Sequence, residues 1–160
     1  MNNAFLLTGG NLGQPQLNLD LARSLIAREC GEILRVSAFY RTAAWGLAGQ
    51  PDFLNQAIQL GTTLEPMLLL ENLLDIEQRI GRVRKEKYGP RLIDIDILLY
   101  DDVIADQPGL LLPHPRLAQR RFALIPLDEI APALIHPVSG KTIHQLLLEC
   151  TDPLPVEIMD

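Results

Sequence analysis

The sequence predicts an α+β protein with a ferredoxin-like fold, in which helices pack on a mostly antiparallel sheet in an α-β-α sandwich-like arrangement. Two observations support this prediction. Segments typical of strands and helices follow the order β-α-β-β-α-β, which places the two intervening helices on one face of the sheet. The chain has 160 residues, 48% of them hydrophobic and 21% charged, which is enough for one domain with a substantial core. We therefore expect residues 1–160 to form a single domain.

The first predicted strand and helix are bounded by glycines and a proline. Residues 4–8 (AFLLT) form a short apolar run before Gly9 and Gly10, which predicts a buried strand. A helix is expected from Pro15, which suits a first turn, to Gly31, which suits a helix end. Leucines recur within it at four-residue spacing, at Leu17, Leu21 and Leu25.

Two strands are predicted next, over residues 33–41 and 53–61. Side chains alternate along a strand, so the second strand has two distinct faces. One face carries Leu54, Ile58 and Leu60, and the other carries Phe53, Asn55 and Ala57.

A second helix is expected from Pro66 to Gly81, followed by an irregular segment and a last strand. The apolar stripe of this helix consists of Leu69, Leu73, Ile76 and Ile80. Residues 82–91 have no periodicity and are interpreted as a mobile loop, whereas residues 92–100 (LIDIDILLY) are typical of a strand. The proline-rich remainder is expected to hold turns and short helices, with a closing helix near 142–149.

The overall composition excludes several classes of protein. A net charge of −6 argues against a duplex nucleic-acid binder, which needs a broad basic face. Cys30 and Cys150 stand alone, so neither a zinc site nor a disulfide framework is indicated. The N-terminus lacks the pattern of a signal peptide, and no stretch approaches the roughly 20 apolar residues of a membrane span. We therefore expect a cytoplasmic enzyme.

Asp94 and Asp96 stand two positions apart in the last predicted strand and project from the same face. Their Cα atoms are then roughly 6–7 Å apart, close enough to bind one divalent ion or to hold two. Magnesium prefers such carboxylate oxygens, completed by phosphate and water. The opposite face is expected to supply core residues, namely Ile93, Ile95, Ile97 and Leu99. A strand that merely exposes two acids is the alternative, but the apolar flanks and a preceding basic segment favour a metal site.

The segment from Arg79 to Arg91 carries a net charge of +5 in an otherwise acidic chain. Its arginines at 82, 84 and 91 suit phosphate, because a guanidinium can donate two parallel hydrogen bonds to phosphate oxygens. Arginine and magnesium together stabilise a transferring phosphoryl group. A solvated charge run is the alternative. No Walker A motif is present, so a P-loop NTPase is not expected. Without ligand, mutual repulsion of the arginines is expected to keep the loop open.

Several ordered motifs together resemble one enzyme family, 6-hydroxymethyl-7,8-dihydropterin pyrophosphokinase. The run KYGPRLIDIDILLY is similar to the family's signature, and GGNLG is similar to its opening element. RIGRVRKEKYGPR resembles the family's catalytic loop, SAFYRTAAWGLAGQPDFLNQA its second and third strands, and LPHPRLAQRRFALIPLDEIAP its C-terminal signature. The resemblance therefore spans nearly the whole chain.

The resemblance implies transfer of pyrophosphate from ATP to the 6-hydroxymethyl oxygen of the pterin, with release of AMP and with two magnesium ions. It implies Asp94 and Asp96 as the magnesium ligands, and Arg82 and Arg91 as the residues that stabilise charge during bond breaking. Whether Asp96 also accepts the hydroxyl proton is a hypothesis. The residues implied in ATP binding are Glu77, Arg84, Tyr88, Arg91, Ile97, His114 and Arg120.

The pterin site also has an argument of its own. A flat ring with donors and acceptors at its edge calls for aromatic faces and an amide, and Phe53 and Asn55 share one strand face. The resemblance implies Phe122 on the other side of the ring, with further contacts from Thr42, Ala43, Ala44 and Trp45. Core packing is the alternative for each phenylalanine, whereas a buried amide such as that of Asn55 needs partners.

Two other functional classes remain as alternatives. One is a non-catalytic ferredoxin-like module that binds a nucleotide or metal, which would not require the acid pair, the basic loop and the pterin residues together. The other is a small RNA-binding domain, which needs exposed aromatic residues and a basic surface, whereas this chain is acidic with 5% aromatic residues. We expect a monomer that binds small molecules, without nucleic-acid or membrane partners.

Overall fold

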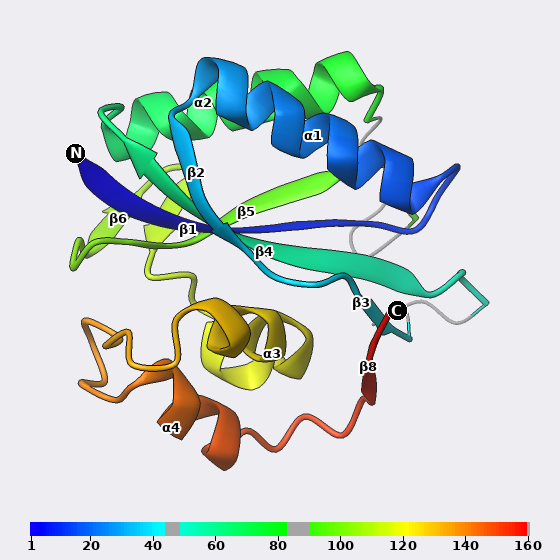
Figure 1. Cartoon of the computed structure of the whole chain (residues 1–160). Helices are drawn as coiled ribbons and strands as arrows, with labels where there is room; N and C mark the ends of the chain where they lie inside the picture. The colour runs from blue at the N-terminus through cyan, green and yellow to red at the C-terminus, as the bar shows by residue number, and fades with distance from the viewer. Residues whose placement is uncertain (44–48, 83–89, 160) are drawn as a thin grey trace.

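In the computed structural model, which describes residues 1–43, 49–82 and 90–159, a six-stranded β-sheet lies between two layers of helices (Figure 1). The strands of this sheet are β1 (Asn2–Gly10), β2 (Glu32–Val36), β3 (Tyr40–Thr42), β4 (Phe53–Thr62), β5 (Asp94–Tyr100) and β8 (Val156–Ile158). The helices are α1 (Pro15–Glu29), α2 (Pro66–Ile80), α3 (Arg121–Ile130) and α4 (Ile143–Glu149), with a 3₁₀ turn at Leu117–Gln119. Strands β6 (Ala105–Gln107) and β7 (Leu110–Leu112) form a separate hairpin.

The described strands of the main sheet pair antiparallel throughout. Their order is β5-β1-β4-β3-β8, and β2 also pairs with β4. The long strand β1 therefore lies between β4 and β5, and its apolar sequence is explained by burial on both faces. This arrangement confirms the predicted α+β class with a mostly antiparallel sheet.

The predicted strand over residues 33–41 is in fact two strands, β2 and β3, that both pair with β4. The break lies at Ser37 and Ala38. The Ser37 hydroxyl accepts the Ala57 N–H at 2.9 Å, and the Glu129 carboxylate accepts the Ala38 N–H. The Ser37 N–H still donates to the Ala57 carbonyl at 2.9 Å, whereas the Ala38 N–H donates to a side chain, and the ladder starts again at Tyr40.

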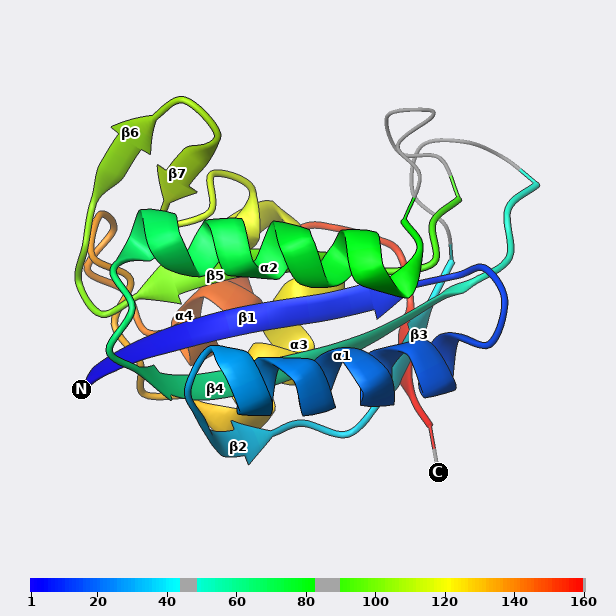
Figure 2. The same ribbon diagram turned by 90° about the horizontal axis from the view of Figure 1, so that it is seen from above.

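Helices α1 and α2 run side by side over one face of the sheet, as predicted (Figure 2). The stripe of α2 is confirmed, because Leu69, Leu73 and Ile76 are buried. In α1 the buried residues are instead Leu19, Ala22 and Ile26. The leucines at 17 and 21 are 60% and 47% exposed, because a row of residues spaced by four drifts around a helix of 3.6 residues per turn.

The other face of the sheet is covered by α3 and α4 (Figure 1). Helix α4 confirms the closing helix expected near 142–149, whereas the β-α-β-β-α-β order had placed helices on one face only. These helices come from the proline-rich part of the chain, where the periodic signal is weak. They bury Leu124, Leu127, Ile143 and Leu146 against Phe5 and other residues of β1, β4 and β5. The sheet is therefore the middle layer of an α-β-α sandwich.

Strand β5 contains a bulge that moves Leu99 to the face opposite the one predicted. Phe5 of β1 pairs with Leu99, but the next residue, Leu6, pairs with Ile97, so Leu98 is an extra residue in the strand. Leu98 and Leu99 both join the core beneath α3 and α4. The predicted placement of Ile93, Ile95 and Ile97 on the α1–α2 side is confirmed.

No helix in the described ranges combines the length and the apolar character that crossing a bilayer requires.

Candidate active site

The predicted site residues of three strands lie on one face of the sheet. Gly9 of β1 pairs with Asp94 of β5 on one side and with Asn55 of β4 on the other. Paired residues of an antiparallel ladder share a face, and Asp96 pairs in the same way with Leu7, which belongs to the core beneath α3 and α4. The acid pair and Asn55 therefore point to the α3 side of the sheet.

Only one strand separates Asp94 from Asn55, which places their Cα atoms roughly 10 Å apart, at two strand spacings. Gly9 lies in that gap. A Cβ atom added at Gly9 would stand 2.5 Å from the Asn55 Oδ1 atom, so the absence of a side chain leaves room for the amide. The predicted metal site and the predicted pterin site are thus adjacent.

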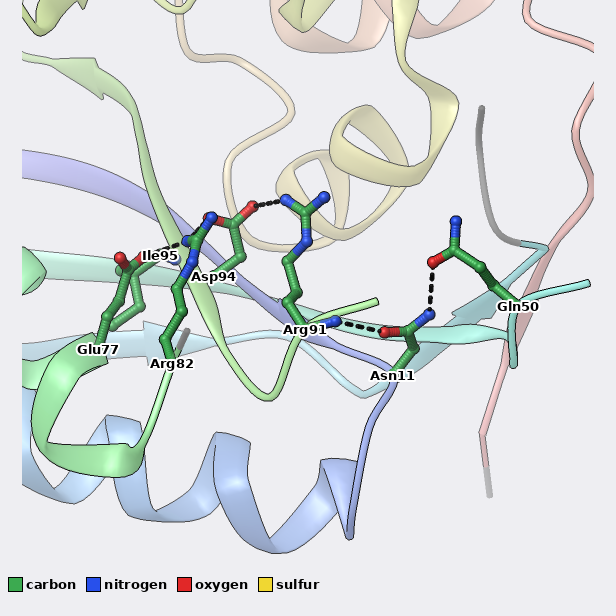
Figure 3. A network of polar contacts seen from close by, with 7 residues as sticks. All are labelled: Asn11, Gln50, Glu77, Arg82, Arg91, Asp94 and Ile95. Atoms are coloured by element: carbon green, nitrogen blue, oxygen red, sulfur yellow. Dashed lines mark hydrogen bonds and ion pairs between the residues drawn. The ribbon is translucent and has the colours of Figure 1, made fainter. Parts of the chain in front are cut away.

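Asp94 is held by two arginines (Figure 3). The Arg82 Nη1 atom lies 2.6 Å from Asp94 Oδ1, and the Arg91 Nη1 atom lies 3.1 Å from Asp94 Oδ2. We expected repulsion among the arginines of residues 82–91, but these two are brought together by one shared carboxylate. Residues 83–89 of that segment, which include the predicted ATP-binding residues Arg84 and Tyr88, lie outside the described residues.

Glu77 of α2 has its carboxylate buried beside Arg82. Its Oε2 atom accepts the Ile95 backbone N–H at 2.7 Å and the Arg82 Nη1–H at 3.1 Å. Among the described strands, β5 lies at the edge of the sheet and none pairs with its outer side, so Glu77 satisfies the Ile95 N–H there. Glu77 therefore fixes Arg82 against the edge of β5.

A pocket of about 250 Å³ opens next to this contact and is lined by Leu74, Glu77, Gln78 and Arg82. Ile97 was predicted to contact the nucleoside, but its side chain packs in the core beneath α1 and α2. A contact between Ile97 and a ligand would therefore have to come from its backbone.

Asp96 is half-buried, and burial raises its pKa to about 7, with a further contribution from the negative charge of Asp94. The positive charges of Arg120 and Arg82 act in the opposite direction. A divalent cation between the two carboxylates would favour their charged forms. The donor set suits magnesium, which is commonly held by one or two protein carboxylates together with substrate phosphates. Within the described residues, no group of three or more His, Cys, Asp or Glu side chains forms a closed metal site.

Three further predicted site residues lie between β7 and the first turn of α3, on the side of the sheet that the acid pair faces. They are His114, Arg120 and Phe122. The His114 N–H donates to the Leu98 carbonyl at 2.9 Å, which ties this residue to β5. Its Nδ1 atom accepts the Arg116 N–H at 3.2 Å, so the neutral ring carries its proton on Nε2. Burial, followed by the charge of Arg120, lowers the pKa of His114 to about 4, which keeps the ring neutral near pH 7.

Two aromatic rings near the site each carry an arginine on one face. The Arg91 Cζ atom lies 5.7 Å from the centre of the Phe53 ring, and the Arg120 Cζ atom lies 5.5 Å from that of Phe122. These distances are typical of cation–π contacts. Each predicted pterin-stacking phenylalanine therefore contacts an arginine that is predicted to bind ATP.

The predicted pterin-binding polar residues are buried and bonded to each other. Thr42 Oγ1 accepts a hydrogen bond from Asn55 Nδ2 at 3.1 Å. Thr42 pairs with Phe53 across β3 and β4, so the three residues form one group. Ala43 is exposed next to them. Ala44 and Trp45 lie outside the described residues.

Asn11 is part of the site, although we assigned it no role from the sequence. Its buried side chain accepts the Arg91 N–H at 2.9 Å and donates to Gln50 Oε1 at 3.1 Å (Figure 3). It also donates to the Pro51 carbonyl at 3.0 Å. It thereby joins the segments that lead to the acid pair and to Phe53. The signal for it in the sequence was its place in the GGNLG motif, directly after the two glycines that follow residues 4–8.

The sequence matches a known family over most of its length. The family model described as 7,8-dihydro-6-hydroxymethylpterin-pyrophosphokinase (HPPK) matches residues 5–132. A Synechocystis protein named 2-amino-4-hydroxy-6-hydroxymethyldihydropteridine pyrophosphokinase is 45% identical over 151 residues, which cover 92% of this chain and 77% of the relative. A protein of the same name from Methylorubrum extorquens is 40% identical over 158 residues, with 98% of both chains covered.

The fold is also similar to that of solved structures. The crystal structure of Plasmodium falciparum HPPK-DHPS wild type with pteroate aligns with a TM-score of 0.76 at 16% identity. The alignment covers 92% of this chain and 42% of the solved chain, so this chain corresponds to less than half of that longer protein. At such low identity the likeness establishes a shared fold.

Proposed function

The chain belongs to the 7,8-dihydro-6-hydroxymethylpterin-pyrophosphokinase family, whose members transfer pyrophosphate from ATP to 6-hydroxymethyl-7,8-dihydropterin in folate biosynthesis, and we propose that it performs this transfer on the sheet face beside α3. One observation supports this location of the active site. The acid pair, two arginines and the amide–aromatic group converge on this face although they come from distant parts of the sequence. A transfer reaction needs two substrate sites side by side, and this face offers both.

On this proposal Asp94 and Asp96 hold two magnesium ions together with the phosphate oxygens of ATP. Bound there, magnesium would neutralise these oxygens and polarise the β-phosphorus that is attacked. The raised pKa of Asp96 is in keeping with this role, because it reflects first the burial of the carboxylate and then the negative charge of Asp94, and a bound cation would offset both. Asp96 as acceptor of the hydroxyl proton remains a hypothesis. An unchanged pH–rate profile in an Asp96→Asn variant that still binds metal would remove it.

The arginines supply the remaining positive charge. Arg82 and Arg91 would leave Asp94 for the phosphate oxygens, where their charge stabilises the group in transfer. Arg120 and the Nε2–H of neutral His114 would donate to the triphosphate. Glu77 and the Ile97 backbone would border the nucleoside beside the pocket at the end of α2.

The pterin would lie between Phe53 and Phe122, with its edge on the amide of Asn55. Thr42 holds that amide in place and offers its own hydroxyl. Ala43, Ala44 and Trp45 would close the pocket from the segment after β3, and Arg84 and Tyr88 would contact ATP from the segment after Arg82. These assignments follow from the resemblance of the motifs. We further infer a single domain that acts as a cytoplasmic monomer.

An assay of AMP formation tests the function. We expect AMP only when ATP, magnesium and hydroxymethyl-dihydropterin are all present. Asp94→Asn should lower kcat by roughly 100-fold or more, because it removes a charge that acts on the transferring group. Asp75→Asn is the control, since Asp75 is exposed and pairs with Arg79 on the outer surface of α2. A non-catalytic module would instead bind ATP and metal without releasing AMP.

A further inference from the structure

The C-terminal segment of residues 150–158 connects the two sides of the proposed pterin site. It leaves the end of α4, passes the start of α3 and ends as β8 beside β3 (Figure 1). The start of α3 carries Phe122, and β3 carries Thr42. Both residues belong to the proposed pterin pocket, on opposite sides of it.

At the α3 end, Arg121 binds the segment from the first turn of the helix. Its Nη2–H donates to the Cys150 carbonyl at 2.8 Å, and its Nη1–H donates to the Asp152 carbonyl. In return, Asp152 Oδ2 accepts the Arg121 backbone N–H at 3.1 Å. The helix has no side-chain cap from its own N-cap residue, so Asp152 supplies one from 31 positions away.

At the β3 end, the segment joins the sheet. Val156 pairs with Thr42, and Ile158 pairs with Tyr40. The Met159 N–H also donates to the Phe39 carbonyl at 2.9 Å. Thr42 in turn accepts the Asn55 amide, so β8 supports the polar wall of the pocket through one intervening residue.

We propose that residues 150–158 act as a strap that sets the separation between the two walls of the pterin site, with Arg121 and Asp152 as positioning residues. This inference rests on the proposed function. Stacking and edge hydrogen bonds both depend on distance, so a pocket whose walls are held by one segment is already shaped for a flat ring. The acid pair and Arg82 lie on β5 and after α2, away from the strap. Among the proposed nucleotide contacts, Arg120 is the one adjacent to Arg121 in the sequence, so nucleotide binding should depend on the strap less than pterin binding does.

The test compares substitutions in the full-length protein. Arg121→Ala removes both side-chain bonds to the strap, Arg121→Lys keeps the charge with a single ammonium group, and Asp152→Ala removes the helix cap. Lys141→Ala is the matched control, because Lys141 lies in the same C-terminal part of the chain and forms an exposed ion pair with Glu149. Circular dichroism below the melting temperature selects the variants that remain folded.

Affinity is measured for 6-hydroxymethylpterin and, separately, for the magnesium complex of α,β-methylene-ATP. In Arg121→Ala and Asp152→Ala we expect pterin affinity to fall on the order of tenfold, while nucleotide affinity changes less than about threefold. Arg121→Lys should restore part of the loss, and Lys141→Ala should bind both ligands like the parent protein.

Two outcomes would contradict the proposed role of the strap. One is unchanged pterin affinity in the folded Arg121 and Asp152 variants. The other is an equal loss of pterin and nucleotide affinity, which would indicate general loosening of the fold. Failure of the proposed function is distinguishable, because then the parent protein itself would neither bind the pterin nor release AMP.

Discussion

Asp94 shows at the scale of one residue how the site balances its charges before any ligand binds. Both oxygens of its carboxylate are engaged, one by Arg82 at 2.6 Å and one by Arg91 at 3.1 Å. These pairs are largely shielded from water, so they are less screened than pairs on the surface. If a cation replaced the arginines at Asp94, another anion would have to compensate their charge to avoid the cost of unpaired buried charges, and the triphosphate of ATP would be such an anion.

His114 gives a pH-dependent prediction at the same scale. Its pKa is about 4 in the folded protein, below the ordinary value of 6.5, because of burial and then the charges of Arg120 and Arg116, with Asp94 acting in the opposite direction. Between these two pH values the unfolded chain binds a proton that the folded protein does not. The free energy of unfolding is therefore expected to fall as pH drops from 6.5 to 4, and to be unaffected by this group above that window.

Replacing the imidazole should remove that dependence. In His114→Gln, the loss of stability between pH 7 and pH 4 should be smaller than in the parent protein by on the order of 2 kcal/mol. Urea denaturation across this pH range measures it, with His144→Gln as a control for removal of an exposed imidazole. The prediction would be contradicted if the free energy of unfolding fell by the same amount between pH 7 and pH 4 in His114→Gln and in the parent protein.

Elements meet at the site through groups that no single strand or helix contains. Asn11 follows β1, yet it bonds to Gln50 and Pro51 before β4 and to Arg91 before β5. Its backbone N–H also donates to the Arg91 carbonyl at 3.0 Å. Three segments are therefore held together by one buried side chain and its backbone.

Removal of this side chain should cost stability. Asn11→Ala leaves the Arg91 N–H and the Pro51 carbonyl without their present partner, and we expect a loss of about 2–3 kcal/mol in the free energy of unfolding. Chemical denaturation measures it. Asn72→Ala is the matched control, since the Asn72 amide makes one bond to the Leu68 carbonyl within α2. An equal loss of stability in Asn11→Ala and Asn72→Ala would contradict the proposal that Asn11 joins the three segments.

The end of β1 offers a second prediction at the scale of elements, from two neighbouring glycines. A Cβ atom at Gly9 would meet the Asn55 side chain at 2.5 Å, whereas one at Gly10 would meet the Leu92 carbonyl oxygen at 2.4 Å. A side chain can turn away, but the Leu92 carbonyl moves only with the backbone that leads into β5. Gly9→Ala should therefore weaken pterin binding with little change in melting temperature, and Gly10→Ala should lower the melting temperature.

Calorimetric titration and thermal melting of both variants separate these effects. We expect pterin affinity to fall about tenfold in Gly9→Ala, because the displaced amide no longer meets the ring edge. The destabilisation in Gly10→Ala is expected to be about 1–3 kcal/mol, as for other overpacked sites. The reverse pattern would show that the Asn55 amide is not the group that recognises the ring.

For the whole molecule, the arrangement of charge suggests the order in which the substrates bind. Arg91 pairs with Asp94 and at the same time lies over the Phe53 ring, at 5.7 Å. One face of the Phe53 ring is therefore covered by the Arg91 guanidinium. Magnesium–ATP would draw Arg91 toward the phosphates and expose that surface.

We accordingly predict ordered binding with the nucleotide first. The affinity for 6-hydroxymethylpterin should rise at least about tenfold when the magnesium complex of α,β-methylene-ATP is present, a change of about 1.4 kcal/mol. Titration with and without the analogue measures this coupling. Equal pterin affinity under both conditions would refute the order.

Local patterns in the sequence were sufficient for several features of this molecule. Side chains alternate along a strand, which placed Asp94 and Asp96 on one face of β5. Helical spacing likewise predicted the buried apolar stripe of α2. Both patterns are properties of a single element and can be recognised without knowledge of its neighbours. The motifs from GGNLG to LPHPRLAQRR indicated the family before any contact was known.

Other features depended on the tertiary structure. The bulge at Leu98, the α3–α4 layer and the sharing of Asp94 by two arginines arise from contacts between elements, and the Asn11 junction joins residues up to 80 positions apart. Sequence by itself thus determined helices α1 and α2, the strands β1, β4 and β5, and the shared face of Asp94 and Asp96. Only the folded chain decided which elements meet, because packing and buried hydrogen bonds act between groups that are distant along the sequence and close in space.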